Sequence, residues 1–258
     1  MSFQNELETG VYEKKQLLSK SRLIAWSHRS RFEFGLDQVR AFGGRSILDY
    51  GCGDGVFLKS LNGAYEKCVG VDISTNFIND CRLRMGSRPG YDFLMVDELE
   101  AHYGPESFDV ITCMETLEHC TTDTVDEILL KCRRLLKPDG LLLISVPIEV
   151  GPSLLAKQLG RMISGLRNIG DYRLAFENYT LPEMVTMTFA NEKSTIRRPY
   201  AVDQDSAYGH KGFNWMSLKK QVQNYFEIEN KNFTPLPATG SFLNSQAWFR
   251  CSISKARP

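Results

Sequence analysis

Several features that mark common protein classes are scarce in this sequence. The 31 Lys and Arg residues balance 31 Asp and Glu residues, so the formal net charge is zero. A neutral chain is not expected to grip long nucleic acid through a broad basic surface, although a short RNA end remains open. The first residues lack a basic start followed by an apolar core, and no apolar run reaches the length of a membrane span. We therefore expect a cytoplasmic protein.

Cysteine is present but without the spacing of a metal site or a disulfide framework. The seven cysteines are scattered over the chain at 52, 68, 81, 113, 120, 132 and 251. Reduced and mostly buried thiols are the expectation for such a set in the cytosol. The 258 residues are enough for one large α/β domain with an insertion.

An apolar run ending in three alternate glycines is the most informative stretch. Residues 47–55 read Ile-Leu-Asp-Tyr-Gly-Cys-Gly-Asp-Gly. Glycine is needed where a chain reverses sharply after a parallel strand, and where a cofactor lies against the backbone. A second apolar run ends in Asp72, 21 residues after Gly51, where a carboxylate that binds ribose is expected. The two runs together predict a nucleotide-type cofactor site.

Strand and helix patterns alternate from Ser46 to Val146, with helices expected near 55–62, 75–86 and 124–136. Alternation of this kind predicts a parallel sheet covered on both faces, with ligands beyond the carboxyl ends of its strands. Residues 11–42 are expected to form two helices. A helix at 215–225 and strands at 226–234 and 246–254 should end the chain.

The alternation of strands and helices stops at 151–208. We interpret this segment as a long insertion on the substrate side. It opens with residues 152–163, where apolar positions recur at helical spacing and the charges are basic. This pattern is typical of a helix on a membrane surface, and equally of a lid over a pocket. We favour the lid, while glycines at 160, 165 and 170 argue against one long helix.

The Asp-x-Gly-x-Gly-x-Gly spacing differs from the dinucleotide fingerprint and resembles motif one of the class I S-adenosylmethionine-dependent methyltransferases. Phe93 to Asp97, Ser107 to Cys113 and Leu135 to Gly140 resemble later motifs of that class, so the resemblance covers residues 28–150. It implies a Rossmann-like α/β fold: a seven-stranded, mostly parallel sheet with the last strand antiparallel and helices on both faces. It also implies an N-terminal helical cover at 1–44 and a methyltransferase domain at 45–258.

The same resemblance implies S-adenosylmethionine as the cofactor. In the ubiquinone-pathway O-methyltransferases, an arginine at the offset of Arg31 from Gly51 meets the cofactor's carboxylate, which suits a guanidinium fork. The alternative for Arg31 is an ordinary surface ion pair. The cofactor-binding residues implied are Arg31, Asp49, Gly51, Gly53, Asp72, Ile73, Asp97 and Met114.

The stretch Cys113 to His119 is the candidate for catalysis. If a helix begins at Glu115, then Glu115, Glu118 and His119 share one face and suit a divalent metal. The stretch resembles the ubiquinone-pathway catechol O-methyltransferases. It also resembles the small-RNA 3′-terminal 2′-O-methyltransferases, in which these residues and a later histidine hold magnesium.

His210 is the later histidine here, with one extra residue before the following aromatic. Glu115, Glu118, His119 and His210 would then hold a magnesium ion. In the alternative without metal, Glu118 and its neighbours cap a helix or line the cofactor pocket, and His210 or His119 is the general base.

We therefore expect an S-adenosylmethionine-dependent O-methyltransferase that acts on a hydroxyl of a small molecule or glycan, with one hydroxyl of a vicinal pair as a narrower alternative. A terminal ribose 2′-O-methyltransferase for RNA and a cofactor-binding module without catalysis are the competing hypotheses. Membrane contact through 152–163 is a further open alternative.

Overall fold

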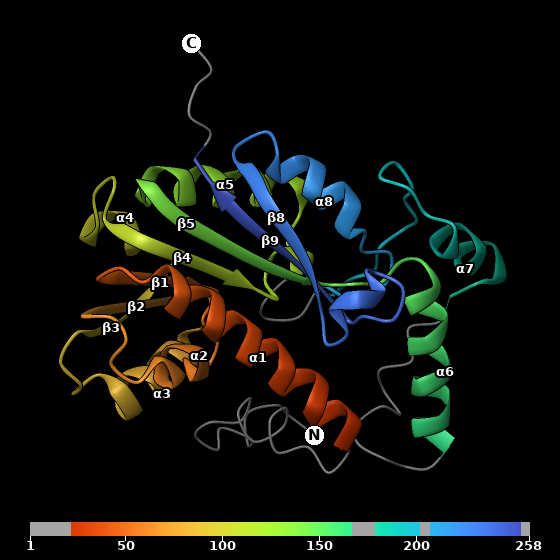
Figure 1. Ribbon diagram of the computed structural model, residues 1–258, viewed down its shortest axis with the longest axis horizontal. Coiled ribbons are helices and arrows are strands. Elements are labelled where there is room, and N and C mark those ends of the chain that lie inside the picture. The colour runs from red at the N-terminus through yellow and green to blue at the C-terminus, as the bar shows by residue number, and fades with distance from the viewer. Residues whose placement is uncertain (1–21, 167–178, 202–206, 254–258) are drawn as a thin grey trace.

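A computed structural model describes residues 22–166, 179–201 and 207–253 (Figure 1). Its main sheet has seven strands in the order β3-β2-β1-β4-β5-β9-β8. The strands are β1 (Ser46–Tyr50), β2 (Lys67–Asp72), β3 (Tyr91–Met95), β4 (Phe108–Met114), β5 (Leu136–Pro147), β8 (Glu227–Thr234) and β9 (Gln246–Ser252). Strands β1 to β5 pair in parallel, whereas β9 runs antiparallel to both β5 and β8. The predicted fold class is confirmed.

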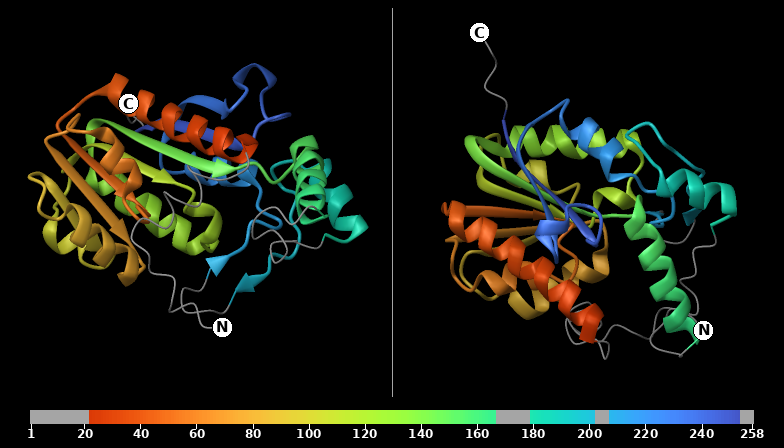
Figure 2. Two further views of the ribbon diagram at one scale, coloured as in Figure 1. Left: turned by 90° about the horizontal axis from the view of Figure 1, so that it is seen from below. Right: turned by 45° about the vertical axis from the view of Figure 1, so that its right-hand side comes forward.

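Helices cover both faces of this sheet, as Figures 1 and 2 show. One face carries α1 (Arg22–Phe42), α2 (Val56–Leu61) and α3 (Thr75–Met85), and the other carries α4 (Leu99–His102), α5 (Thr122–Leu135) and α8 (Trp215–Val222). Side chains alternate across a strand, so Ile47 packs with the first set and its neighbour Leu48 with the second. This double burial explains the continuous apolar runs of the central strands.

Helix α5 shows how the local sequence sets an element. The Thr121 hydroxyl accepts a hydrogen bond from the Thr124 amide and caps the helix start. Basic residues in the last turn oppose the partial negative charge of the helix end. Buried side chains recur at helical spacing along one face, namely Val125, Ile128, Leu129, Cys132 and Leu135. The helices predicted at 55–62, 75–86 and 124–136 are thus confirmed within about two residues as α2, α3 and α5.

The insertion lies beyond the carboxyl end of β5 (Figure 1). It contains α6 (Pro152–Leu166), α7 (Leu181–Thr188) and a small hairpin of β6 (Tyr200–Ala201) and β7 (Ala207–Tyr208). Helix α6 continues through Gly160 and Gly165, although glycine weakens a helix at these positions, and Gly170 lies outside the described residues. Helix α7 begins with a capping box between Thr180 and Glu183.

The elements near the two ends of the chain follow the predicted order and are shorter than the predicted ranges. The last helix and two strands lie within the ranges predicted from the sequence. At the other end α1 is one of the two helices expected in residues 11–42, and residues 11–21 lie outside the described part. The division at residue 44 stays a prediction. All seven cysteines are free, as expected. No helix in the described part of the chain is both long enough and apolar enough to span a membrane.

Candidate active site

A pocket opens at the carboxyl end of β1, where the glycine-rich turn begins. Its lining includes the turn, the aromatic ring of Phe32 and two residues from the end of β4, Met114 and Glu115. Arg31 and Asp49 also line it. Five of the eight cofactor-binding residues predicted from the sequence therefore meet here, namely Arg31, Asp49, Gly51, Gly53 and Met114.

Gly51 and Gly53, two of the three glycines at this turn, have different surroundings. Gly51 has φ +80°, and a Cβ atom there would lie 2.1 Å from the Thr116 hydroxyl oxygen, so this glycine is needed for packing. Gly53 has φ +53°, and a Cβ atom there would meet nothing within 4 Å. The backbone at Gly53 is thus not covered by a side chain beside the pocket. A cofactor needs such free space to lie close to the backbone.

Asp72 holds this turn from the end of β2. Its carboxylate accepts hydrogen bonds from the Gly53 amide at 2.9 Å and from the Ser74 amide at 2.9 Å. Ile73, which follows, is 63% exposed, and Asp97 after β3 is also exposed. Asp72, Ile73 and Asp97 lie outside the pocket lining, and their cofactor contacts stay predictions.

Asp49 is a buried carboxyl group beneath the pocket. Burial raises its pKa to about 7, against the opposing effect of a 2.7 Å hydrogen bond donated by the Thr112 hydroxyl. Asp72 adds a repulsive charge in the same direction. A carboxyl group with this pKa changes its charge near neutral pH and responds to any ligand charge brought beside it.

Arg31 forms a buried ion pair across the pocket with Glu115, at 3.1 Å. Glu115 also accepts a 3.2 Å hydrogen bond from the amide of Gln246. The guanidinium is thus buried at the pocket wall and not in a surface ion pair, with a carboxylate as its neighbour. Its predicted contact with the carboxylate of a cofactor stays a prediction.

The structure departs from the expected helix at Glu115. Strand β4 ends at Met114, Glu115 has φ +53°, and a short 3-10 helix, η3 (Leu117–His119), begins two residues later. The left-handed conformation at Glu115 turns this side chain toward Arg31, away from the face it was expected to share with Glu118 and His119. The predicted helical face is therefore wrong, and the role of Glu115 as a metal ligand stays a prediction without support from this geometry.

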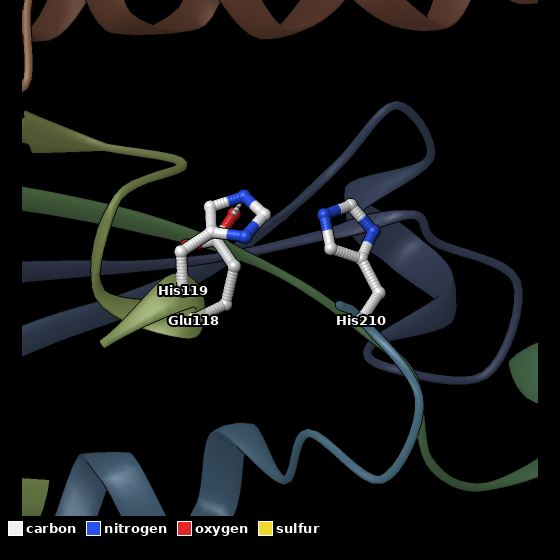
Figure 3. Close-up of side chains that lie close together, drawn as sticks. All are labelled: Glu118, His119 and His210. Atoms are coloured by element: carbon white, nitrogen blue, oxygen red, sulfur yellow. Dashed lines mark ion pairs between the residues drawn. The ribbon is translucent and has the colours of Figure 1, made fainter. Parts of the chain in front are cut away.

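Three of the four predicted metal ligands do come together (Figure 3). One ligand atom from each of Glu118, His119 and His210 lies within 4.8 Å of the others. The two imidazole rings are 5.1 Å apart between centroids. His210 comes from the turn after β7, whereas the other two belong to η3. Across the described residues this is the group that suits a metal ion.

Glu118 is the unusual member of this group. Its side chain has no solvent exposure, and neither carboxylate oxygen has a hydrogen-bond partner in the part of the chain described. Burial raises the pKa of this carboxyl group well above its usual range, and the nearby Glu115 charge adds to the effect. A buried carboxylate without hydrogen bonds is costly unless a cation compensates it. The donor set therefore fits a divalent cation.

Both histidines are oriented as metal ligands usually are. The Nδ1 of His119 is 2.7 Å from the carbonyl oxygen of Tyr208, so Nδ1 donates the hydrogen bond and Nε2 keeps its lone pair. That Nε2 lies 3.9 Å from Glu118 Oε1. In His210 the Nδ1 lies 3.9 Å from the carboxylate of Glu149, and Figure 3 shows its other nitrogen turned toward His119. Ligating histidines commonly have such an acceptor behind the ring.

Glu149 is a site residue that the sequence analysis missed. It follows β5, is 1% exposed and forms a 2.9 Å ion pair with Lys157 of α6. Burial lowers the pKa of His210 to about 4, although the Glu149 charge opposes this shift. His210 is therefore neutral at physiological pH and able to bind a cation or accept a proton. A lone glutamate after an apolar strand carried no spacing signal that would have identified it.

Comparison with known proteins finds sequence similarity to methyltransferases. Residues 48–144 match a family model described as "Methyltransferase domain". The chain is 32% identical over 108 residues to the ubiquinone biosynthesis O-methyltransferase of Thiobacillus denitrificans, covering 41% of this chain and 45% of that protein. The chain thus spans about half the length of the curated relatives it matches.

Solved structures resemble the chain over more of its length. A protein from Pyrococcus horikoshii OT3 gives a TM-score of 0.59 at 17% identity, covering 93% of this chain and 96% of that one. Magnesium protoporphyrin IX methyltransferase from Synechocystis gives 0.52 at 18% identity, covering 91% and 88%. At such identities these two likenesses show the fold alone. Residues 48–144 thus match a methyltransferase-domain model, and the chain has the fold of these two solved structures.

Proposed function

We propose that this protein is an S-adenosylmethionine-dependent O-methyltransferase whose acceptor is a small molecule bearing two adjacent hydroxyl groups. A divalent cation at Glu118, His119 and His210 would hold those hydroxyls. The observation that carries the proposal is the buried carboxylate of Glu118, which has no hydrogen-bond partner among the described residues and faces two histidines at the mouth of a methyltransferase fold.

The cofactor part of the proposal is supported by the turn at Gly53. Bare backbone there faces a pocket lined by Arg31 and Asp49. The likeness to magnesium protoporphyrin IX methyltransferase, whose structure holds S-adenosylhomocysteine, is consistent with this cofactor class. The relatives named as ubiquinone biosynthesis O-methyltransferases support oxygen as the nucleophile.

The chemistry assigned to the cluster is proton removal and orientation. In methyl transfer the hydroxyl oxygen forms a bond to the methyl carbon, the carbon–sulfur bond breaks, and the hydroxyl proton must leave. A bound divalent cation lowers the pKa of a hydroxyl and fixes its direction. Glu118 and the imidazoles of His119 and His210 would hold that cation. His210 or His119 would act as the base if transfer occurs without metal.

Methyl transfer from isotopically labelled cofactor would test this function. The acceptors are 3,4-dihydroxybenzoate, 4-hydroxybenzoate, a vicinal-diol sugar and a short RNA with or without its terminal 2′-hydroxyl, each with magnesium or with EDTA. We expect transfer to a vicinal diol but not to 4-hydroxybenzoate, and loss of transfer with EDTA. Glu118→Gln should abolish transfer and leave the affinity for S-adenosylhomocysteine unchanged.

Three other results would contradict the proposal in different ways. Transfer that EDTA does not affect would remove the metal and favour a histidine base. Transfer only to RNA carrying the terminal 2′-hydroxyl would favour a ribose methyltransferase. Tight S-adenosylhomocysteine binding with no transfer to any of these acceptors would favour a binding module without catalysis.

A further inference from the structure

The turn that carries His210 is hydrogen-bonded to one part of the insertion, residues 179–198. We call this segment the bracket. The Asn214 side chain donates hydrogen bonds to the carbonyls of Asn191 and Ser194 at 2.8 and 3.0 Å. The Gly212 amide donates to the Tyr179 hydroxyl at 3.1 Å. Hydrogen bonds from both the backbone and a side chain of the turn therefore connect it to the bracket.

The end of the bracket also packs closely on this turn. A Cβ atom at Gly212 would lie 2.8 Å from Ile196 and 3.1 Å from the Arg198 side chain. The ion pair between Lys211 and Glu183, at 2.8 Å, adds a contact with α7. Three of the four residues that follow His210 are thus in contact with the same segment.

Arg198 joins this turn to the other half of the cluster. Its Nη2 donates to the carbonyl of Glu118 and, at 3.3 Å, to the carbonyl of Gly209. The guanidinium lies 4.5 Å from the ring centroid of Tyr208 and 5.5 Å from that of Phe213. One planar cation therefore bridges η3 and the His210 turn, and two aromatic rings hold it in place.

From these contacts we propose that Arg198 is a positioning residue that sets the separation between His210 and the pair Glu118–His119. This inference rests on the proposed function, because that pair and His210 are its metal ligands. The hydrogen bonds that Arg198 donates to these two segments go to backbone carbonyls. Its action on the site is through the carbonyls of Glu118 and Gly209.

Electrostatics and positioning predict opposite effects of removing this side chain. Arg198 is a positive charge near a cation site, and it lowers the pKa of Glu118 against the larger effect of burial. If only charge mattered, a neutral residue there would make a divalent cation bind more tightly. If Arg198 positions the ligands, cation affinity falls when the bridge is lost. Loss of an outer partner of a metal ligand typically costs about 10- to 100-fold in metal affinity.

The experiment compares wild type, Arg198→Met, Arg198→Lys and the control Arg197→Met in the full chain. Arg197 is the preceding residue and its side chain is exposed. For each protein, Mn²⁺ affinity is measured by electron paramagnetic resonance with S-adenosylhomocysteine bound. Cofactor affinity is measured by calorimetry, and amide hydrogen exchange is followed for the peptide covering 207–214.

We expect Arg198→Met to lower Mn²⁺ affinity about 10- to 100-fold. It should also speed exchange in the 207–214 peptide at least about tenfold, with unchanged cofactor affinity. Arg198→Lys should recover little, because a compact ammonium group lacks the planar surface that lies against the rings of Tyr208 and Phe213. Arg197→Met should match wild type in all three measurements.

Other outcomes would overturn the inference. Tighter Mn²⁺ binding by Arg198→Met, or wild-type exchange in the 207–214 peptide, would show that Arg198 does not position the turn. A parallel loss of cofactor affinity would assign it a general structural role. Wild type that binds cofactor but not Mn²⁺ would contradict the metal in the proposed function, and hydrogen exchange would still decide the role of Arg198.

Discussion

The Glu118 carboxylate and the His210 imidazole lie together at the mouth of the sheet although 92 residues separate them in the sequence. Glu118 reaches this point from η3 after β4, and His210 from the turn that precedes α8. Their proximity brings the segment after β4 close to the turn before α8. The proposed cation site is close in sequence to the pocket of the glycine-rich turn, because Glu115, three residues before Glu118, lines that pocket.

Glu149 should control the affinity of this site for a cation. Its carboxylate lies 3.9 Å from His210 Nδ1 and 2.9 Å from Lys157 Nζ. Glu149→Gln removes the negative charge behind the His210 ring and should lower Mn²⁺ affinity about 10- to 100-fold. Lys157→Met, the matched variant of the ion pair, leaves that charge in place and should not lower it. An equal loss of Mn²⁺ affinity in both variants would mean that Glu149 acts on the site only through its ion pair with Lys157.

The bare backbone at Gly53 should matter more for the cofactor than for the fold. Gly53→Ala places a methyl group beside the pocket, in a left-handed conformation that costs an L residue about 1–2 kcal/mol. Gly63 has φ +82° and equally open surroundings but lies outside the pocket lining, so Gly63→Ala is the control. Both variants should lose similar unfolding free energy, whereas only Gly53→Ala should bind S-adenosylhomocysteine more weakly. Equal cofactor affinities would place the cofactor away from Gly53.

The raised pKa of Asp49 predicts a pH-dependent stability. The folded protein holds the Asp49 proton up to a pKa of about 7, against an ordinary value of 3.8, so it binds more protons than the unfolded chain between these values. The contribution of Asp49 to stability therefore falls as pH rises from about 4 to 7 and is constant above that range.

Asp49→Asn is neutral at every pH and can still accept the Thr112 hydrogen bond. Its stability advantage over wild type should be near zero below pH 4 and largest at pH 8, on the order of 4 kcal/mol at most. Urea unfolding at pH 4 and pH 8 measures this difference. An advantage that is the same at both pH values would show that folding does not raise the pKa of Asp49.

Much of the fold could be predicted because its signals are local. The runs around Leu48 and Val69 are apolar on both faces, and the glycines after Tyr50 mark the sharp turn that a parallel strand requires. The order of the elements then follows from alternation. Helix α6 was less predictable, because Gly160 and Gly165 lower helix propensity while the rest of that segment favours the helix.

The site was predicted where neighbouring residues share one turn, and missed where its geometry depends on distant segments. Glu118 and His119 are adjacent, so their proximity needs no tertiary structure. Glu115 differs because its backbone turns into the left-handed region, which no helical spacing rule anticipates. Glu149, just after β5, and Arg198, in the insertion, reach the cluster only through tertiary packing, so the sequence carries no spacing signal for either.

The most direct test of the central claim is a calorimetric titration of metal-stripped protein with S-adenosylhomocysteine and then with magnesium or manganese. Wild type and Glu118→Gln are compared, because the amide keeps the shape of the side chain and removes its charge. We predict that both proteins bind S-adenosylhomocysteine equally and that only wild type then binds a divalent cation saturably. Cation binding of equal affinity in the two proteins would contradict the account, because the buried Glu118 carboxylate would then not be the ligand that defines the site.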